Sequence, residues 1–389
     1  MSERVPEGWC KENISSVARL EYGKSPISVK DEGGPYPIIG TSGIVGSASE
    51  SLWEKQSVVI GRKGTINKPL FVPKPFWAID TTYFCKFPKT TDPKWFYYKI
   101  VDEGLERYNE ASGVPSLSRD TLNSVCILVP PLLEQEKIAA ILTSVDDVIE
   151  TTQKQIDKLQ DLKKATMNEL LTKGIGHTEF KDSELGRIPK SWEVAELLNC
   201  VDRIVDCEHK TAPEIEYSDF FVVSTNAVRD GELVEGNLYN TSKEAFERWT
   251  SRAIPKEGDV MFTREAPAGE SCCVPKNRNV CLGQRMVLLR PNSEILNGEF
   301  LNFFLSSDAG KNSVYQMSLG TTVARINMAD INKLKIPLPA LSEQKLAAKI
   351  ISGFEVMISK QKSKMEKFHY LKRSLMHDLL TGKVRVQVT

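Results

Sequence analysis

The chain has 389 residues, of which 41% are hydrophobic and 26% are charged, and its formal net charge is zero. This composition is typical of an ordinary soluble protein, and the length predicts two or more domains rather than one core. Zero net charge argues against a protein that binds nucleic acid over its whole surface, and the lack of a long apolar run or signal-peptide core predicts a cytoplasmic protein without a membrane span.

Residues 1–130 are predicted to form a mixed α/β domain. A helix is expected at 91–110, where apolar side chains recur at helical spacing. A glycine-rich turn and a short edge strand at 125–129 follow, and Pro130-Pro131 end the strand and begin the next helix. Short runs bounded by glycine and proline predict further strands at 36–40, 57–60, 70–72 and 82–87.

Residues 131–174 are predicted to form one long helix, which ends at a glycine after a basic last turn. Apolar residues recur along it in steps of three and four, which is typical of a coiled coil. Thr152 interrupts this seam, where it either sets the register of a helix pair or is only a polar gap. The predicted seam consists of Ile138, Ile141, Val145, Val148, Ile156, Leu159 and Leu162.

A polar linker is expected at 175–187, and a second mixed domain at 188–338. The opening of that domain, Ile188-Pro189 with Trp192, repeats the Val5-Pro6 and Trp9 pattern of the first. The second domain is expected to contain strands at 220–223, 259–262, 286–289 and 334–337, and a helix around 300–308.

A second long helix is predicted at 339–383, followed by a tail at 384–389. Shifting the first helix by 209 residues aligns it with the second without a gap, and such a repeat determines the architecture. Gln361 falls at the level of Thr152. The aligned seam consists of Ala347, Ile350, Phe354, Met357, Met365, Phe368 and Leu371. Because so narrow a seam needs a partner, we expect an α+β protein with two globular domains separated by two long helices in a coiled coil.

Charge is distributed unevenly along the chain. Residues 1–130 contain 16 Lys and Arg against 15 Asp and Glu, whereas residues 339–389 contain 10 against 4. The second helix therefore carries a basic stripe, which is either a solvated face or a surface for phosphate or protein.

The motifs of several enzyme classes are missing from the sequence. It contains no Gly-x-Gly-x-x-Gly after a strand and no Asn-Pro-Pro-Tyr clamp of an amino-methyltransferase. The eight cysteines do not form Cys-x-x-Cys pairs or zinc-spaced Cys/His clusters, so we expect reduced thiols, no metal and no cofactor. No set of residues suggests a nucleophile with its base and oxyanion donor, so we do not expect an enzyme.

Polar and basic loops recur at equivalent places in both domains. Gly61-Arg62-Lys63-Gly64-Thr65 follows a strand in the first domain, and Thr263-Arg264-Glu265 follows one in the second. Ser116-Leu117-Ser118-Arg119 similarly matches Arg325-Ile326-Asn327-Met328. Arginine and lysine bind phosphate or guanine edges, and asparagine and glutamine can bind adenine. A single loop of this kind is usually only a polar surface, but recurrence favours a binding function.

With these features, the chain resembles the DNA-specificity subunits of type I restriction–modification enzymes over essentially its full length. The motifs that carry the resemblance are the helix starts at 130–139 and 338–347, the helix ends at 167–172 and 376–381, the Ile188-Pro189-x-x-Trp192 entry, and the turn at 320–326. The resemblance implies two target-recognition domains, each of which reads half of a split DNA site. It also implies that the helices pack antiparallel with pseudo-twofold symmetry and space the two domains.

The resemblance implies partners as well as DNA. Two modification subunits would dock on the long helices and supply the methyltransferase, and restriction subunits would add DNA cleavage, so the chain itself would not be catalytic. A helix of about 40 residues is about 60 Å long, which is enough to hold two readers about 34 Å apart on successive major grooves. The expected DNA contacts are Lys24, Arg62, Lys63, Thr65, Ser116, Ser118, Arg119, His209, Lys210, Thr225, Asn226, Arg229, Arg264, Gln284, Arg285 and Arg325.

Two alternatives to a DNA-specificity subunit remain open from the sequence. The chain could be a scaffold that does not bind DNA, with two ligand-binding domains on a coiled-coil spacer. It could also be the recognition part of a single-chain restriction–methylation enzyme, although the missing methyltransferase motifs argue against this within the present sequence.

Overall fold

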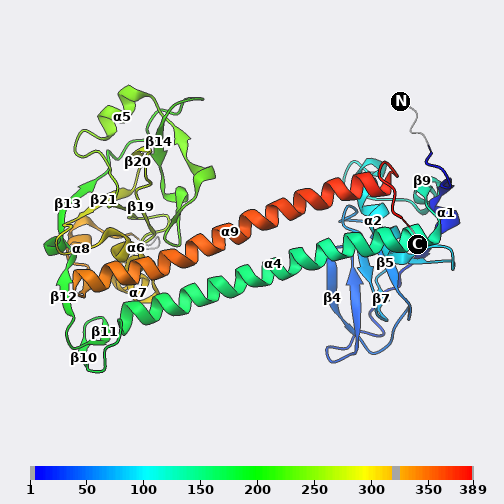
Figure 1. Cartoon of the computed structure of the whole chain (residues 1–389), viewed down its shortest axis with the longest axis horizontal. Helices are drawn as coiled ribbons and strands as arrows, with labels where there is room; N and C mark the ends of the chain where they lie inside the picture. Colours follow the sequence, from blue (N-terminus) through cyan, green and yellow to red (C-terminus); the bar gives the residue numbers. More distant parts are fainter. Residues whose placement is uncertain (1–4, 318–324, 388–389) are drawn as a thin grey trace. The chain divides into compact units, whose positions relative to one another are not determined.

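The computed structural model describes residues 5–317 and 325–387. The chain divides into two compact units, residues 1–154 with 362–389 (unit 1) and residues 155–361 (unit 2). The long helices α4 (Leu132–Thr172) and α9 (Leu341–Leu380) are each unbroken, and each contributes one half to either unit (Figure 1). The expected turn at 320–326 lies largely outside the described residues.

The domain of unit 1 is built on two small sheets. An antiparallel sheet has the order β2 (Arg19–Tyr22), β8 (Thr82–Lys86), β5 (Ser57–Gly61), β6 (Leu70–Val72). A three-stranded sheet has the order β4 (Gly43–Ala48), β3 (Tyr36–Gly40), β7 (Trp77–Ala78), in which β3 and β7 are parallel. The remaining elements are β1 (Cys10–Asn13) paired with β9 (Cys126–Val129), and helices α1 (Ile14–Val17), α2 (Pro93–Glu103) and α3 (Arg119–Ser124).

Helix α2 shows how the local sequence sets the ends of an element. The Asp92 side chain accepts a hydrogen bond from the Trp95 N–H at 2.7 Å, and Pro93 occupies the first turn, where its missing N–H costs nothing. Gly104 has a φ of 65°, which ends the α-helix, and a short 3₁₀ turn, Leu105–Tyr108, follows. The expected helix at 91–110 is therefore two shorter helical segments.

Unit 2 repeats this topology with longer connections. Its antiparallel sheet has the order β13 (Val201–Asp206), β21 (Met286–Pro291), β18 (Val260–Thr263), β19 (Ser271–Cys273). Its second sheet has the order β17 (Tyr239–Asn240), β14 (Phe220–Val223), β20 (Asn279–Leu282), with β14 and β20 parallel. The other elements are β12 (Glu193–Glu196) paired with β22 (Lys335–Leu338), the hairpin β15 (Val228–Arg229) and β16 (Glu232–Leu233), and helices α5 (Lys243–Trp249), α6 (Gly298–Ser306), α7 (Asp308–Met317) and α8 (Met328–Asn332).

The segment expected to be a polar linker contains regular structure. Strands β10 (Phe180–Ser183) and β11 (Gly186–Pro189) form an antiparallel hairpin between α4 and the domain of unit 2. The sequence of 175–187 did not predict the hairpin, because β10 is polar and has no buried residue, and only the last two residues of β11 are buried.

A glutamate in the first turn of each long helix attaches that helix to its domain. In unit 1 the Trp9 indole donates to Glu134 at 3.1 Å, and Arg385, from the expected tail, bonds both oxygens of Glu134 at 2.6 and 3.2 Å. In unit 2 the Trp192 indole donates to Glu343 at 3.2 Å, and the backbone N–H of Ile175 donates to it at 2.9 Å. The repeated tryptophan thus donates the same hydrogen bond to the helix glutamate in both units.

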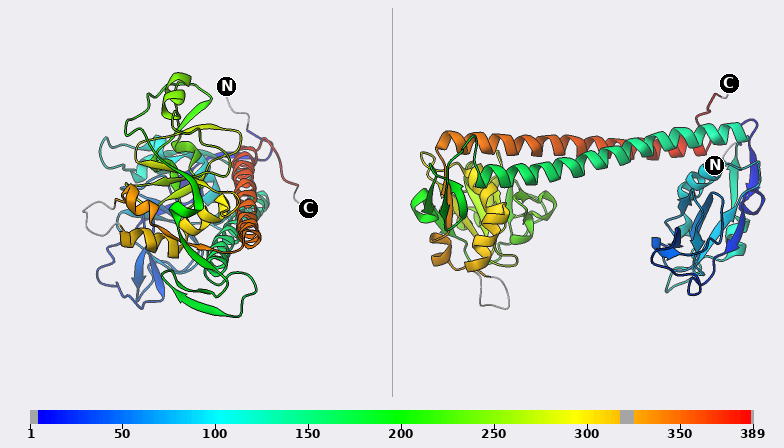
Figure 2. Two further views of the ribbon diagram at one scale, coloured as in Figure 1. Left: turned by 90° about the vertical axis from the view of Figure 1, so that its left-hand side faces the viewer. Right: turned by 90° about the horizontal axis from the view of Figure 1, so that it is seen from below.

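Each unit pairs the first half of one long helix with the second half of the other. In unit 1 Lys372 forms an ion pair with Asp146 at 2.6 Å, and in unit 2 Lys163 forms one with Glu355 at 2.7 Å. The 209-residue shift aligns Asp146 with Glu355 and Lys163 with Lys372, so the two ion pairs are equivalent in the repeat. The expected antiparallel packing of the helices is confirmed within each unit, as is the repeat of one domain with two helix halves. Taken unit by unit, the sheets lie to one side of the helix segments (Figure 2).

The apolar seam differs from the one read from the sequence. Five of its predicted members are 37–45% exposed, namely Val148, Leu162, Ile350, Met357 and Leu371. Leu142 and Ile358, which lie off the predicted seam, are buried instead, and Thr152, which interrupts the seam, is buried as well. A straight helix of 3.6 residues per turn rotates a seven-residue pattern by about 20° per heptad, so a sequence stripe leaves the contact line. The buried Thr152 hydroxyl donates to the Val148 carbonyl of its own helix at 2.7 Å, as a polar gap would.

Among the described residues, none of the helices has both the length and the apolar character required to cross a membrane.

Candidate nucleic-acid interface

A loop in unit 1 gathers several of the predicted contact residues at the end of β5. A Cβ on Gly61 would lie 2.0 Å from the Thr65 carbonyl, so only glycine allows this tight turn. The Arg62 N–H donates to the Thr81 carbonyl at 2.9 Å, and the Leu117 N–H donates to the Arg62 carbonyl at 2.9 Å. An isolated bridge joins Lys63 to Ser116. The loops at 61–65 and 116–119, distant in sequence, therefore lie side by side.

The Tyr22 ring connects these two loops. The Arg62 guanidinium carbon lies 5.4 Å from the ring centroid, and that of Arg119 lies 4.9 Å from it. Tyr22 also packs on Tyr83 with ring centroids 5.1 Å apart. Burial raises the pKa of Tyr83 to about 12, so at neutral pH its hydroxyl stays protonated and donates to the Leu117 carbonyl at 3.2 Å.

The other predicted contact residues of unit 1 do not lie against the Tyr22 ring in the same way as the two arginines. The Ser118 hydroxyl caps α3, accepting from the Thr121 N–H at 3.0 Å, so its lone pairs are partly engaged in the fold. Thr65 is half-buried in the turn. Lys24 is exposed two residues after Tyr22, and its backbone N–H donates to the Ala78 carbonyl at 2.8 Å.

The corresponding arginine of unit 2 has a different environment. Arg264 is only 8% exposed and forms an ion pair with Asp206 at 2.7 Å. Its Nε donates to the Ile326 carbonyl at 3.3 Å. With its charge paired and its donors engaged, the guanidinium is held inside the domain. It does not have the solvent-facing position that the sequence suggested by analogy with Arg62.

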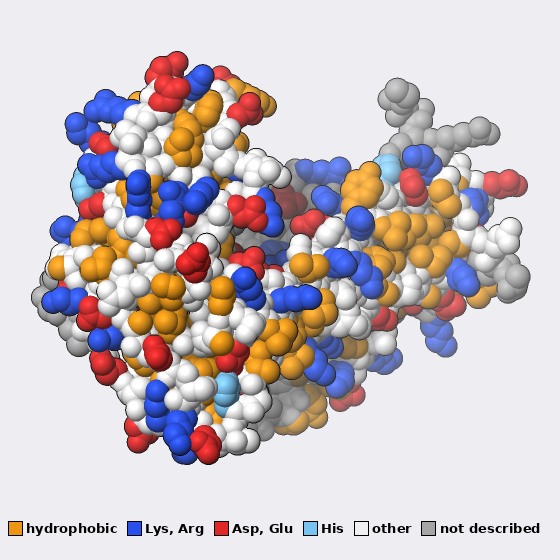
Figure 3. All heavy atoms as spheres, turned by 60° about the vertical axis from the view of Figure 1, so that its left-hand side comes forward, with side chains coloured by type: hydrophobic (Ala, Val, Ile, Leu, Met, Phe, Trp, Pro, Cys, Tyr) orange, Lys and Arg blue, Asp and Glu red, His pale blue; other side chains and the backbone are white. Residues whose placement is uncertain are grey.

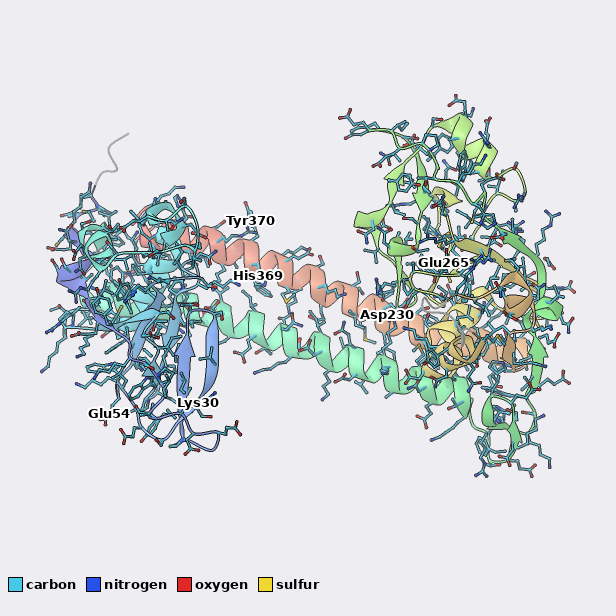
Figure 4. The ribbon with its side chains drawn as sticks, turned by 180° about the vertical axis from the view of Figure 1, so that it is seen from behind. Lys30, Glu54, Asp230, Glu265, His369 and Tyr370 are labelled. Atoms are coloured by element: carbon cyan, nitrogen blue, oxygen red, sulfur yellow. The ribbon has the colours of Figure 1, made fainter. Side chains whose placement is uncertain are left out.

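Two other arginines reach the surface of unit 2 beside Arg264. Arg285 and Arg325 have side chains that are 52% and 56% exposed, and both face Glu265, at 2.5 and 3.9 Å. Glu265, labelled in Figure 4, lies within the β-rich part of the unit. The Gln284 side chain donates to the His209 carbonyl at 3.1 Å. The loops carrying residues 209, 264, 284, 285 and 325 therefore meet at one end of the sheet, as the corresponding loops of unit 1 do.

The remaining predicted residues of unit 2 lie on neighbouring loops. Thr225 and Asn226 begin a 3₁₀ turn, and Asn226 accepts from the Ser224 hydroxyl at 2.6 Å. A Cβ on Gly283 would lie 3.2 Å from that of Ser224, so this turn adjoins the residue 284–285 loop. Lys210 is exposed after His209. Arg229 belongs to the β15–β16 hairpin, where it pairs with Glu232.

Asp206, Cys207 and His209 have ligand atoms within 4.8 Å of one another, close enough to coordinate a metal ion. Their atoms are already used in the hydrogen-bond network, however. The Asp206 carboxylate accepts from the Arg264 guanidinium at 2.7 Å, and His209 Nε2 lies 3.1 Å from it. Cys207 Sγ accepts from the Arg285 N–H at 3.2 Å. Because the Arg264 guanidinium would repel a cation, the arrangement fits a network that orders the loops better than a metal site.

Three residues of these clusters were not predicted as contacts. Tyr22 and Asp206 end the edge strands β2 and β13, and Glu265 follows Arg264. Nothing in the sequence pointed to Tyr22 or Asp206, because only strand pairing brings them to the arginines. In Figure 3, Lys and Arg side chains are mixed with Asp and Glu over the near face of unit 2. This agrees with a surface on which basic side chains lie next to acidic ones and do not form one large basic patch.

The fold defines a protein with two like α+β domains, each presenting arginine-bearing loops at one end of its sheet and each joined to a pair of long helices. The model of the type I restriction modification DNA specificity domain matches residues 6–161 and 205–367. The chain belongs to this family.

Curated relatives and a solved structure agree with this membership. The chain is 27% identical to the specificity subunit of the type I restriction enzyme MjaVIII of Methanocaldococcus jannaschii, over 99% of this chain and 95% of that one. It is 31% identical to the putative MjaX specificity subunit of the same organism, over 70% of this chain and 62% of that one. The fold is similar to that of a type I restriction–modification S subunit from M. genitalium, with a TM-score of 0.62, 13% identity, and coverage of 98% of this chain and 97% of that one.

Proposed function

We propose that this chain is the sequence-specific DNA-binding subunit of a type I restriction–modification complex, and that each domain reads one half of a bipartite target. The observation that carries the proposal is the repeated site. In both units, loops that are distant in sequence meet at the same end of the antiparallel sheet and carry arginines there, the half-buried Arg62 and Arg119 in one and the exposed Arg285 and Arg325 in the other. Guanidinium groups suit both phosphate and the guanine edge.

We also propose that two identical modification subunits dock on the long helices. Val148 and Leu371 are exposed in unit 1, and Met357 and Leu162 are exposed in unit 2. The 209-residue shift relates Val148 to Met357 and Leu162 to Leu371, so each unit presents the same pair from opposite helices. Two equivalent surfaces suit two copies of one partner. Tyr370, labelled in Figure 4, adds a 70% exposed ring beside Leu371.

In this proposal the chain has no catalytic activity of its own. Methylation of adenine with S-adenosylmethionine belongs to the modification subunits, and ATP-dependent cleavage belongs to the restriction subunits that join them. The alternative of a scaffold that does not bind DNA gains no support from the family membership or from the arginine-bearing loops.

The test begins with methylome sequencing of cells that express this chain with its modification subunit, which identifies the target. Fluorescence anisotropy of the purified complex then compares the target duplex with duplexes in which either half is scrambled. We expect Arg62→Ala and Arg285→Ala each to weaken binding by about 1–3 kcal/mol and to relax different halves. Equal binding of target and scrambled duplexes by the unaltered complex would exclude a sequence-specific reader and favour the scaffold.

A further inference from the structure

The strand registers place Tyr22 and Asp206 at the same position of the two domains. In unit 1 the central strand β8 pairs Thr82 with Gly61 on one side and Tyr83 with Tyr22 on the other. In unit 2 the central strand β21 pairs Met286 with Thr263 and Val287 with Asp206 in the same way. Arg62 and Arg264 follow Gly61 and Thr263 directly. One edge-strand residue therefore meets the same arginine in both units.

This residue holds its arginine by different chemistry in the two domains. The Asp206 carboxylate pairs with the Arg264 guanidinium at 2.7 Å, which cancels its charge and uses at least one of its donors. The Tyr22 ring attracts the Arg62 and Arg119 guanidinium groups through its π face. An aromatic ring brings no negative charge, and stacking leaves the in-plane N–H groups of a guanidinium free for a ligand.

The side chains around Arg62 and Arg119 do not neutralise the positive charge of these two residues. Within the described part of unit 1, neither Arg62 nor Arg119 forms an ion pair, and the exposed Lys63 adjoins Arg62. Tyr83 packs behind Tyr22, and its hydroxyl holds the Leu117 carbonyl between the two arginine-bearing loops. The Tyr22 ring is thus supported from the core and 44% exposed outward.

We propose that Tyr22 is a positioning residue of the first domain, and that it holds Arg62 and Arg119 side by side as an unneutralised pair facing DNA. In the described part of the second domain, the arginines of the corresponding loops face carboxylates instead. Its equivalent arginine is buried on Asp206, and its exposed Arg285 and Arg325 share the carboxylate of Glu265. Binding to the first half of the target therefore depends more strongly on charge than binding to the second half. This inference rests on the proposed DNA-reading function.

The experiment uses the full chain assembled with its modification subunit and the target duplex identified by methylome sequencing. Anisotropy is measured over a series of salt concentrations for the unaltered complex and for Tyr22→Leu, which removes the π face, and Tyr22→Phe, which keeps it. Tyr97→Leu is the matched control, because Tyr97 is a half-buried tyrosine of the same unit whose ring lies 5.5 Å from a cation, Lys94, outside the candidate interface. Melting curves report any loss of folding.

We expect Tyr22→Leu to weaken target binding about tenfold and to lower the slope of log Kd against log salt by about one to two. Discrimination is expected to fall at one half of the target only. Tyr22→Phe should restore most of the affinity and the slope. Tyr97→Leu should lower the melting temperature without selective loss at either half.

The proposal is overturned if Tyr22→Leu leaves discrimination and salt slope unchanged, if Tyr22→Phe is as weak as Tyr22→Leu, or if both halves of the target lose discrimination equally. If Tyr22→Leu does not fold, Tyr22→Met replaces it as a flexible side chain of similar reach without a π face. Failure of the proposed function is distinct, because the unaltered complex would then show no preference for the target over scrambled duplexes.

Discussion

Arg62 and Arg264 occupy one position in the repeated sheet, but their environments differ. Arg62 lies against the π face of Tyr22, whereas Arg264 is buried on the carboxylate of Asp206. The sequence showed that both arginines follow a strand, and on that basis both were expected to contact DNA. The sequence did not show the partners of the two arginines. Tyr22 and Asp206 lie on edge strands, and in each unit a central strand separates the edge strand from the strand that the arginine follows.

The buried ion pair of unit 2 predicts an effect on stability rather than on base reading. We expect Arg264→Ala to destabilise the protein by about 3 kcal/mol, because it leaves Asp206 without its buried partner. Urea unfolding followed by fluorescence measures the change. Arg285→Ala, whose side chain is 52% exposed, is the control and should stay within about 0.5 kcal/mol. Equal stability of the two variants would contradict the structural role of Arg264.

At the scale of elements, the long helices and most of the core strands could be predicted from periodicity and from proline and glycine. The helix predicted at 131–174 spans Leu132–Thr172, and the strand predicted at 36–40 spans Tyr36–Gly40. The strands β10 and β11 were missed because β10 is polar and has no buried residue, and only the last two residues of β11 are buried. The faces of the helices were only partly predictable, since the domains as well as the partner helix cover them.

The exposed apolar pairs on the helices predict two docking surfaces that can be removed separately. Val148→Glu with Leu371→Glu should abolish the surface of unit 1, and Leu162→Glu with Met357→Glu that of unit 2, because a buried unpaired carboxylate opposes docking. Native mass spectrometry of the assembled complex should show one modification subunit instead of two in either case. The control is Ser359→Glu, an added charge at another exposed position of α9, which should retain both subunits. Loss of neither subunit in the double variants would contradict docking at these surfaces.

At the scale of the whole molecule, the duplication is the feature on which the proposed function depends. The family match occurs twice along the chain, and each unit contains one domain and one half of each long helix. Two copies of one reading fold with different loop residues suit a target made of two unlike halves. In the proposed function, the helices that belong to both units determine the spacing between those halves.

Lengthening both helices by one heptad tests this role. Seven residues inserted after Lys154 and seven after Gln361 keep the apolar faces nearly in phase and add about 10 Å to the pair. We expect the gap in the methylated target to grow by about three base pairs while both halves keep their sequences, since stacked base pairs rise about 3.4 Å. Methylome sequencing reads the gap directly. The same insertion between Lys276 and Asn277, an exposed turn of unit 2, should leave the gap unchanged, and an unchanged gap in the helix variant would contradict the spacing role.

The sequence by itself determined the repeat, the two long helices, the two mixed domains and the equivalence of their loops. These follow from periodic patterns along the chain, because a helix or strand is specified mainly by neighbouring residues. Only the tertiary structure decided which arginines face outward and which faces of the helices stay open. Those properties depend on side chains that are distant in sequence, such as Tyr22 and Asp206, which sheet pairing brings beside the arginines. The chemistry of these side chains determines whether the positive charge of the arginine is cancelled or left for DNA.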